Sequence, residues 1–275
     1  MPRLGRKLDG PGEAARAAAL LDGSYTPTPP RPAVSVVLAR DAADTLEILL
    51  LGRASTMEFL PGRLVFPGGG VDKQDAQDDV LSDDPAVAAI AAQFDVPYSD
   101  ARTKTITAVR ETFEETGILL ARRSGDFDIS AEVLEQERLR TLDRGSTVTA
   151  VLDRLGMTVD ATDLKPWARW VTPAVSTIRF DVTFFFAALP AGQVARHLST
   201  EATDTVWWTP DRVLAGHAAG TVELATPQRT LITELTDIHT VADAFAARRR
   251  LAPVCPAAAR IDGAYYLVFP DDPDQ

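Results

Sequence analysis

Three glutamates occupy one face of a helix that the sequence predicts over residues 108–118, AVRETFEETGI. They are Glu111, Glu114 and Glu115. At 100° per residue, the three carboxylates fall within about 100° of one another, and Val109 and Phe113 lie on the opposite side. Like charges on adjacent turns repel, so a purely structural helix gains nothing from this cluster. A divalent cation would make the cluster favourable instead, because Mg²⁺ takes about six oxygen ligands from carboxylates, water and phosphates. The alternative is a solvated glutamate face.

A proline and three consecutive glycines precede this helix. The segment 65–75, VFPGGGVDKQD, starts with an apolar pair and continues into the glycines at 68–70. This composition is typical of a strand that ends in a tight loop, where the backbone approaches a neighbour closely. Together with the carboxylate cluster, the loop favours a metal site over a solvated helix face.

The two segments together resemble the Nudix box, G-x5-E-x7-R-E-U-x-E-E-x-G-U, in which U is a bulky aliphatic residue. The similarity starts at Gly69 and resumes at 110–118, with Asp75 at the first glutamate of the motif and Thr112 at an aliphatic position. Asp75 and Arg110 are 35 positions apart (110 − 75) where the motif has 8, which implies an insertion of 27 residues (35 − 8). The resemblance therefore requires an excursion of the chain, at about residues 76–102.

A second pattern resembles the coenzyme A signature of Nudix hydrolases, L-L-T-x-R-[SA]-x3-R-x3-G-x3-F-P-G-G. It lies at residues 49–69, where Leu51 replaces the threonine and Glu58 the second arginine. The positions in register are Arg53, Ala54, Gly62, Phe66, Pro67, Gly68 and Gly69. With the insertion and the later run RFDVTFFFAALP, the chain is most similar to the peroxisomal type of coenzyme A diphosphatase and its bacterial relatives, over about residues 33–235.

The Nudix resemblance implies an α/β/α sandwich around a mixed β-sheet and the hydrolysis of a nucleoside diphosphate linked to another group. The ligands it implies for Mg²⁺ or Mn²⁺ are Glu111, Glu114, Glu115 and the Gly69 backbone. Arg110 would pair with a carboxylate of the box and orient it. The base that deprotonates the attacking water would be Glu115 or Glu201, and Asp204 is a further acidic candidate outside the box.

The coenzyme A signature implies cleavage of coenzyme A or acyl-coenzyme A to adenosine 3′,5′-bisphosphate and (acyl-)4′-phosphopantetheine. The expected anion contacts are Arg53, Arg63 and Arg179, since arginine binds phosphate in a bidentate geometry. For Arg179 the alternative is an ion pair with Asp181. Two other functions stay open: a Nudix hydrolase acting on ADP-ribose or a dinucleotide, and a Nudix-fold binding or sensing module without turnover.

Composition limits the class of protein. The net charge of −11 and the pI near 4.8 argue against nonspecific nucleic-acid binding. No membrane span is visible, and a single cysteine, Cys255, excludes an intramolecular disulfide and fits a reducing cytoplasm. We expect residues 1–32 to form a helix and a proline-rich linker, and 33–275 one elaborated domain with extra C-terminal helices. A homodimer is compatible with this organisation.

The remaining patterns place the elements around the site. Apolar runs predict strands at 33–40 and 45–53, joined as a hairpin, and at 167–173 and 178–189. Helices are expected at 85–94, twice within 129–155, and at 210–219, 227–235 and 240–250. The insertion would lie beside the cleft and shape the substrate pocket, or else be an inert surface excursion. Trp167 and Trp170 would stack on a base or belong to the core.

Overall fold

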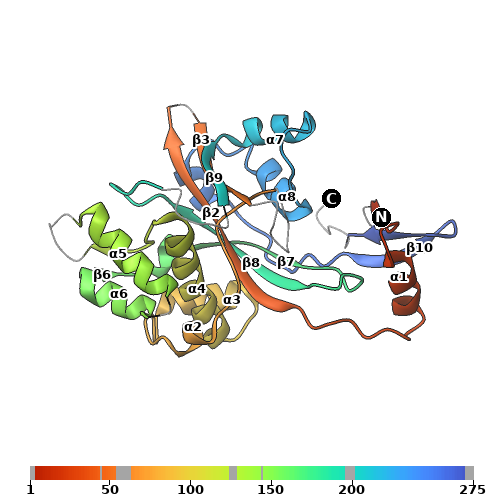
Figure 1. Ribbon diagram of the computed structural model, residues 1–275, viewed down its shortest axis with the longest axis horizontal. Helices are drawn as coiled ribbons and strands as arrows, with labels where there is room; N and C mark the ends of the chain where they lie inside the picture. Colours follow the sequence, from red (N-terminus) through yellow and green to blue (C-terminus); the bar gives the residue numbers. More distant parts are fainter. Residues whose placement is uncertain are drawn as a thin grey trace.

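A mixed β-sheet forms the centre of the protein. The computed structural model describes residues 4–43, 45–53, 63–123, 129–143, 145–195 and 202–269. The sheet runs in the order β4-β3-β2-β8-β7, and β9 pairs with β3 (Figure 1). Its strands are β2 (Arg31–Ala42), β3 (Thr45–Arg53), β4 (Leu64–Val65), β7 (Lys165–Val171), β8 (Phe180–Ala188) and β9 (Ala202–Trp208).

The two central strands are parallel to each other. β2 and β8 pair in register from Arg31 opposite Phe180 to Ala39 opposite Ala188. Residues 33–39 of β2 are buried without alternation, which is the pattern of a strand covered on both faces. The pairs β2–β3, β3–β9 and β7–β8 are antiparallel. The predicted mixed sheet and the 33–53 hairpin are therefore confirmed.

Helices cover both faces of this sheet, which confirms the predicted α/β/α sandwich (Figure 1). On one face, Val36, Leu38 and Phe185 pack against α3 (Pro85–Phe94), α4 (Tyr98–Thr116) and α6 (Val148–Leu155). On the other face, Val37, Ile48 and Phe186 pack against α7 (Pro210–Ala218), α8 (Thr226–Glu234) and α9 (Val241–Ala246). The remaining elements of this part are α2 (Lys73–Gln77), α5 (Ala131–Leu142), η1 (Ala161–Asp163), β5 (Arg122–Arg123) and β6 (Met157–Thr158).

The insertion belongs to the core of the protein. It contains the end of α2, all of α3 and the first turn of α4. Helix α3 starts with the Asp84 side chain accepting from the N–H groups of Ala86 and Val87, and its ring contact Phe94–Phe185 spans 5.9 Å between centroids. Its buried residues are Val87, Ile90, Ala91 and Phe94. Residues 76–102 are therefore not an inert excursion. None of the described residues in this range lines the cavity at the glycine turn, so the expectation that the insertion shapes the pocket is wrong as well.

The two ends of the chain form a second, smaller sheet. Its order is β1-β11-β10, from β1 (Leu4–Lys7), β10 (Ala257–Ile261) and β11 (Ala264–Val268). Helix α1 (Glu13–Leu21) lies beside β10 (Figure 1), and Leu8, Ala17 and Leu267 are buried between them. The predicted N-terminal helix is confirmed. We expected residues 1–32 to be only a helix and a linker, so the pairing of residues 4–7 with the C-terminal strand β11 was not predicted.

Candidate active site

The carboxylate cluster lies near the C-terminal end of α4. The helix ends at Thr116, and Gly117 adopts the left-handed conformation (φ 73°) with its N–H donating to the Phe113 carbonyl. Val109 and Phe113 are buried on the core side, as predicted. The side chains of Glu111 and Glu114 are each 14% exposed on the other side. The helix begins at Tyr98, well before the predicted start near residue 108.

Arg110 connects the two halves of the box across the insertion. Its Nε donates to Asp75 Oδ1 at 2.8 Å and its Nη2 to Asp75 Oδ2 at 2.9 Å. Asp75 is only 2% exposed and also accepts from the Thr107 hydroxyl at 2.8 Å. The Asp72 N–H completes its partners in a capping box at the start of α2. The fold thus brings together two residues that the insertion separates in sequence.

The same guanidinium also holds two glutamates of the cluster. Arg110 Nη1 donates to Glu111 at 2.9 Å and to Glu114 at 3.0 Å, and Nη2 donates to the Gly70 carbonyl at 3.1 Å. Burial by itself lowers the pKa of Arg110, but the Asp75 hydrogen bonds and the three carboxylate charges outweigh it and raise the pKa above its usual range. This geometry is what the expected orienting role of Arg110 requires.

The glycine turn is wedged between β2 and α4. The Gly68 N–H donates to Glu115 Oε2 at 2.8 Å, and the Gly69 carbonyl accepts from the Val34 N–H at 2.9 Å. A β-carbon on Gly69 would lie 2.5 Å from Cδ of Glu111. Only a residue without a side chain lets the turn approach the carboxylate so closely.

Glu111 carries a buried charge that its neighbours compensate only in part. Burial raises its pKa to about 7; the Arg110 charge opposes this rise, and the Glu114 and Asp75 charges add to it. A carboxylate in such a place is an expected ligand for a cation, because a positive charge would favour its ionised form.

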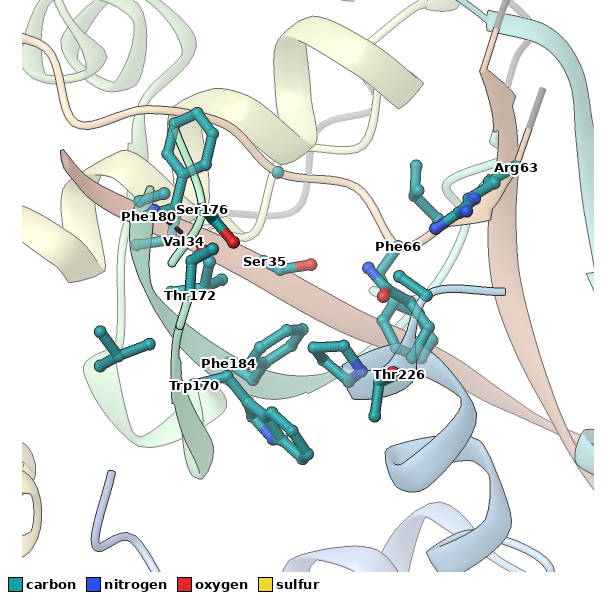
Figure 2. A pocket seen from close by; sticks show the side chains of 18 of the residues that line it. Val34, Ser35, Arg63, Phe66, Trp170, Thr172, Ser176, Phe180, Phe184 and Thr226 are labelled. Carbon is teal, nitrogen blue, oxygen red and sulfur yellow. Dashed lines mark hydrogen bonds between the residues drawn. The ribbon is translucent and has the colours of Figure 1, made fainter. Parts of the chain in front are cut away.

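Glu111, Glu115 and the glycine turn face a cavity of about 610 Å³, and Glu114 is not among the residues that line it. Glu111, Glu115 and Gly68 to Gly70 belong to its lining. Figure 2 shows Arg63 and Thr226 on one side of it and Phe180, Thr172 and Trp170 on the other. The volume is within the range of small-molecule sites, roughly 300–1,000 Å³. A charged region and an aromatic region therefore share one cavity.

The donor chemistry fits a hard divalent cation. Glu111, Glu115 and Gly69 line the cavity, and the Gly69 carbonyl, which accepts from the Val34 N–H, has a second lone pair for another partner. Within the described ranges, no three His, Cys, Asp or Glu side chains already converge on one point. Instead, Arg110 engages Glu111 and Glu114, and the Gly68 N–H engages Glu115.

The predicted anion contacts lie in different places. Arg63 lines the cavity and its Nε is 3.3 Å from Glu223. Arg53 is the last residue of β3, and its side chain lies outside the described part of the structure, as do Ala54, Glu58, Gly62 and Glu201. Asp204 pairs with Gly52 in the β3–β9 ladder.

Arg179 has a structural contact in place of the expected phosphate contact. Its Nη1 donates to the Thr28 carbonyl at 2.7 Å and its Nε to the Thr172 carbonyl at 3.1 Å, and it is not in the cavity lining. The alternative, an ion pair with Asp181, is also wrong. Asp181 pairs with Arg169 instead, at 2.6 Å.

Some residues of the cavity carried no clear signal in the sequence. Trp167 and Trp170 both belong to the hydrophobic core, which confirms the second interpretation of this pair. Trp170 also lines the cavity, and stacking on a base stays a prediction. Gln228, in the first turn of α8, is 8% exposed and its Oε1 has no hydrogen-bond partner among the described residues. Phe269, near the C-terminus, was not predicted as a site residue because nothing local places it here.

Comparison with known proteins identifies the family. A model of the NUDT19 Nudix domain matches residues 83–235, more than half of the 275 residues. The chain belongs to the Nudix hydrolases. This Nudix hydrolase is 27% identical over 218 residues to an acyl-coenzyme A diphosphatase NUDT19 from Xenopus laevis, covering 66% of this chain and 57% of the relative. It is 30% identical over 248 residues to the putative nudix hydrolase 7 of Caenorhabditis elegans, covering 88% of this chain and 73% of the relative.

A solved structure supports the same conclusion. The crystal structure of a Nudix hydrolase from Alicyclobacillus acidocaldarius has a TM-score of 0.65 and 26% identity, and the match covers 81% of this chain and 98% of that chain. These matches confirm the Nudix fold and the resemblance to the coenzyme A diphosphatase type. The chain spans little more than half of the Xenopus relative's length. In the described ranges, no helix of this Nudix hydrolase is long and apolar enough to cross a membrane.

Proposed function

We propose that this Nudix hydrolase uses a divalent cation, Mg²⁺ or Mn²⁺, to hydrolyse the diphosphate of coenzyme A or acyl-coenzyme A. The products would be adenosine 3′,5′-bisphosphate and (acyl-)4′-phosphopantetheine. One observation carries the proposal: Glu111, Glu115, the glycine turn and Arg63 all line a single cavity. The relatives named acyl-coenzyme A diphosphatases support this choice of substrate.

A diphosphate needs charge neutralisation before water can attack it. The residues proposed to hold the cation are Glu111, Glu114, Glu115 and the Gly69 carbonyl. Such a cation supplies Lewis-acid polarisation and lowers the pKa of a bound water. Arg110 and Asp75 would act as positioning residues, since their bidentate pair fixes the guanidinium that holds Glu111 and Glu114.

The proposed bases are Glu115 and Glu201. Glu115 lines the cavity, and its hydrogen bond from the Gly68 N–H fixes one carboxylate oxygen at the glycine turn. A base must lie within hydrogen-bond reach of the water that it deprotonates. Glu115 is in the cavity where such a water would lie, and Glu201, which is outside the described residues, stays the second candidate.

Arg63 is the proposed anion contact inside the cavity. Its pair with Glu223 leaves the two side chains 36% and 70% exposed, and exposed pairs of this kind are weak. A phosphate group could replace Glu223 as the partner of the guanidinium at small cost. The first turn of α8 lies at the same cavity, where Thr226 and Gln228 add polar groups. Arg53 is a further proposed contact, on the coenzyme A signature.

A substrate panel tests this proposal. The purified full chain, with Mg²⁺ or Mn²⁺, is assayed against coenzyme A, an acyl-coenzyme A, ADP-ribose and a diadenosine polyphosphate. We expect a kcat/KM for coenzyme A or its acyl ester at least about tenfold above the others, equivalent to about 1.4 kcal/mol. A tenfold preference for ADP-ribose or the dinucleotide would show that the preferred compound, and not coenzyme A, is the substrate. Tight binding without cleavage would instead indicate a sensing module.

A further inference from the structure

One wall of the cavity is built from the two ends of the chain. Leu267 of β11 and Phe269 beyond it line the cavity, together with Pro256 ahead of β10 and Arg6 of β1. All of these residues lie outside the segment 83–235 that matches the family model. The terminal sheet, composed of β1, β10 and β11, adds a surface to the site from outside the central sheet.

This wall is attached firmly to the central sheet. Phe269 meets Trp170 edge to face, with 6.2 Å between ring centroids and an angle of 73°. Next to this contact, the Val171 N–H donates to the Val254 carbonyl at 2.9 Å and the Val254 N–H to the Arg169 carbonyl at 2.8 Å. The segment leading into β10 thus continues the hydrogen bonding of β7, which holds the two sheets together at the cavity.

Strand β1 supports the ring of Phe269 from behind. Gly5 lies so close that a β-carbon would be 2.8 Å from Cε2 of Phe269 and 2.9 Å from the Leu267 carbonyl. The pairing of β1 with β11 sets this approach, with Leu4 opposite Val268. The position of Phe269 at the cavity therefore depends on both ends of the chain.

The chemistry of this region is apolar. Leu267 and Phe269 share the cavity with three aromatic side chains of the central sheet, Trp170, Phe180 and Phe184. The charged member of the terminal wall, Arg6, donates to Glu13 on α1 at 2.8 Å. Aromatic and aliphatic surfaces stabilise an uncharged group by removing apolar area from water. They provide neither positive charge nor hydrogen-bond donors for a diphosphate.

We infer that the terminal sheet is the specificity element for the arm of the substrate that is not the nucleotide. Phe269 and Leu267, with Trp170, form a subsite for the acyl thioester end of the pantetheine arm and favour acylated over free coenzyme A. This inference rests on the proposed function, because it assigns the diphosphate to Glu111 and Glu115. The apolar region of the same cavity would then hold the uncharged arm.

Two substrates that differ only in the arm test the inference. Dodecanoyl-coenzyme A and coenzyme A share the nucleotide and the diphosphate, so the ratio of their kcat/KM values reports on the arm alone. Phe269→Ala should lower this ratio about tenfold by removing the apolar contact. The matched control is Tyr266→Ala on the same strand, whose side chain points to the opposite face of the terminal sheet by alternation and does not line the cavity. The control should keep the wild-type ratio.

A binding measurement separates this inference from the proposed function. S-dodecanoyl-pantetheine lacks the diphosphate, and its binding can be followed by the quenching of tryptophan fluorescence, to which Trp170 contributes. Wild type and Tyr266→Ala should bind it about tenfold more tightly than Phe269→Ala. If wild type binds this arm but cleaves no coenzyme A ester, the proposed function fails and the subsite stands. If wild type cleaves the ester and Phe269→Ala changes neither ratio nor binding, the subsite is refuted.

Discussion

At the scale of single residues, Arg110 is the centre of the candidate site. Its guanidinium joins Asp75, Glu111 and Glu114, and its side chain is 15% exposed. The sequence predicted that Arg110 contacts a carboxylate of the box. The sequence did not predict that Asp75, which stands at the first glutamate of the motif, would accept from both Nε and Nη2 of Arg110. That contact depends on how the insertion folds. The shorter side chain suffices since α2 places Asp75 next to α4.

Removing the charge of Asp75 should destabilise the protein. Asp75→Asn keeps the shape but leaves Arg110 without its bidentate partner, and breaking a buried pair from one side costs about 3 kcal/mol. We expect that loss in the free energy of unfolding, measured by urea titration. Asp79→Asn is the control, because Asp79 is exposed in the same segment and should change the value by less than about 0.5 kcal/mol. Equal stabilities for the two variants would refute the structural role of the pair.

The glutamates should matter for turnover and not for folding. Glu114→Gln and Glu115→Gln each remove one proposed ligand charge at the end of α4, so kcat should drop by several orders of magnitude. The urea midpoint should stay close to that of wild type, since both side chains lie on the side of α4 away from the core. Glu132→Gln, an exposed glutamate on α5, is the matched control and should retain full kcat. Unchanged turnover in the Glu114 and Glu115 variants would eliminate the metal assignment.

At the scale of elements, two neighbouring glycines of the glycine turn are required for different reasons: Gly69 for turnover and Gly68 for stability. A β-carbon on Gly69 meets the end of the flexible Glu111 side chain, which can rotate away. A β-carbon on Gly68 meets the Val34 carbonyl and lies 2.6 Å from Ser35 Cα, both in the backbone of β2, and Gly68 has φ 151°. Gly69→Ala should therefore abolish turnover with little change in stability, and Gly68→Ala should cost about 2 kcal/mol or more of unfolding free energy. Comparison of kcat and urea midpoints checks both, and the reverse pattern would contradict the geometry.

The pair between β7 and β8 should give a specific dependence on pH. Burial raises the pKa of Asp181, but the Arg169 hydrogen bonds and charge outweigh burial and the pKa is lowered overall. A lowered carboxyl pKa stabilises the folded state above the unfolded value, near 3.9, and this contribution is lost as pH falls through the folded value. Asp181→Asn should therefore cost about 1 kcal/mol at pH 5 to 8 and progressively less below about pH 4. Urea titrations of both proteins across this range measure the difference, and a difference independent of pH would contradict the assignment.

The elements that the sequence predicted well are those with strong local patterns. The β-branched and aliphatic runs of β2 and β3 and the proline-started helices α3, α7 and α8 appear where expected. The early part of α4 was missed because residues 98–107 are rich in threonine, which disfavours isolated helices. In the fold, Thr105 and Thr107 are buried, and their hydroxyls donate to the Ala101 carbonyl at 2.9 Å and to Asp75 at 2.8 Å. Tertiary packing thus overrides the local preference.

At the scale of the whole molecule, the terminal sheet is the feature that sequence patterns could not predict. Leu4 pairs with Val268 from the other end of the chain, and no local signal specifies such a partner. Gly5→Ala tests the link to the site, since its methyl group would displace the ring of Phe269. We expect it to reproduce the loss of acyl preference of Phe269→Ala while kcat/KM for free coenzyme A stays within about twofold of wild type. Wild-type selectivity in a folded Gly5→Ala protein would show that β1 does not position the ring.

Net charge also acts at this scale. At −11, the protein as a whole repels an anionic substrate, so attraction has to come from groups at the cavity. Arg63 is a cationic side chain there, and Glu111 and Glu115 in the same cavity would repel the substrate unless a cation accompanies them. This repulsion between the carboxylates and an anionic substrate is the physical reason why the proposed function includes a divalent metal.

Mass spectrometry of the products from coenzyme A is the most direct test of that account. Wild-type protein with Mg²⁺ should give adenosine 3′,5′-bisphosphate and 4′-phosphopantetheine in equal amounts, and neither should form with a chelator or with Glu115→Gln. Intact coenzyme A after long incubation with metal, or products cleaved at any bond other than the diphosphate, would contradict it.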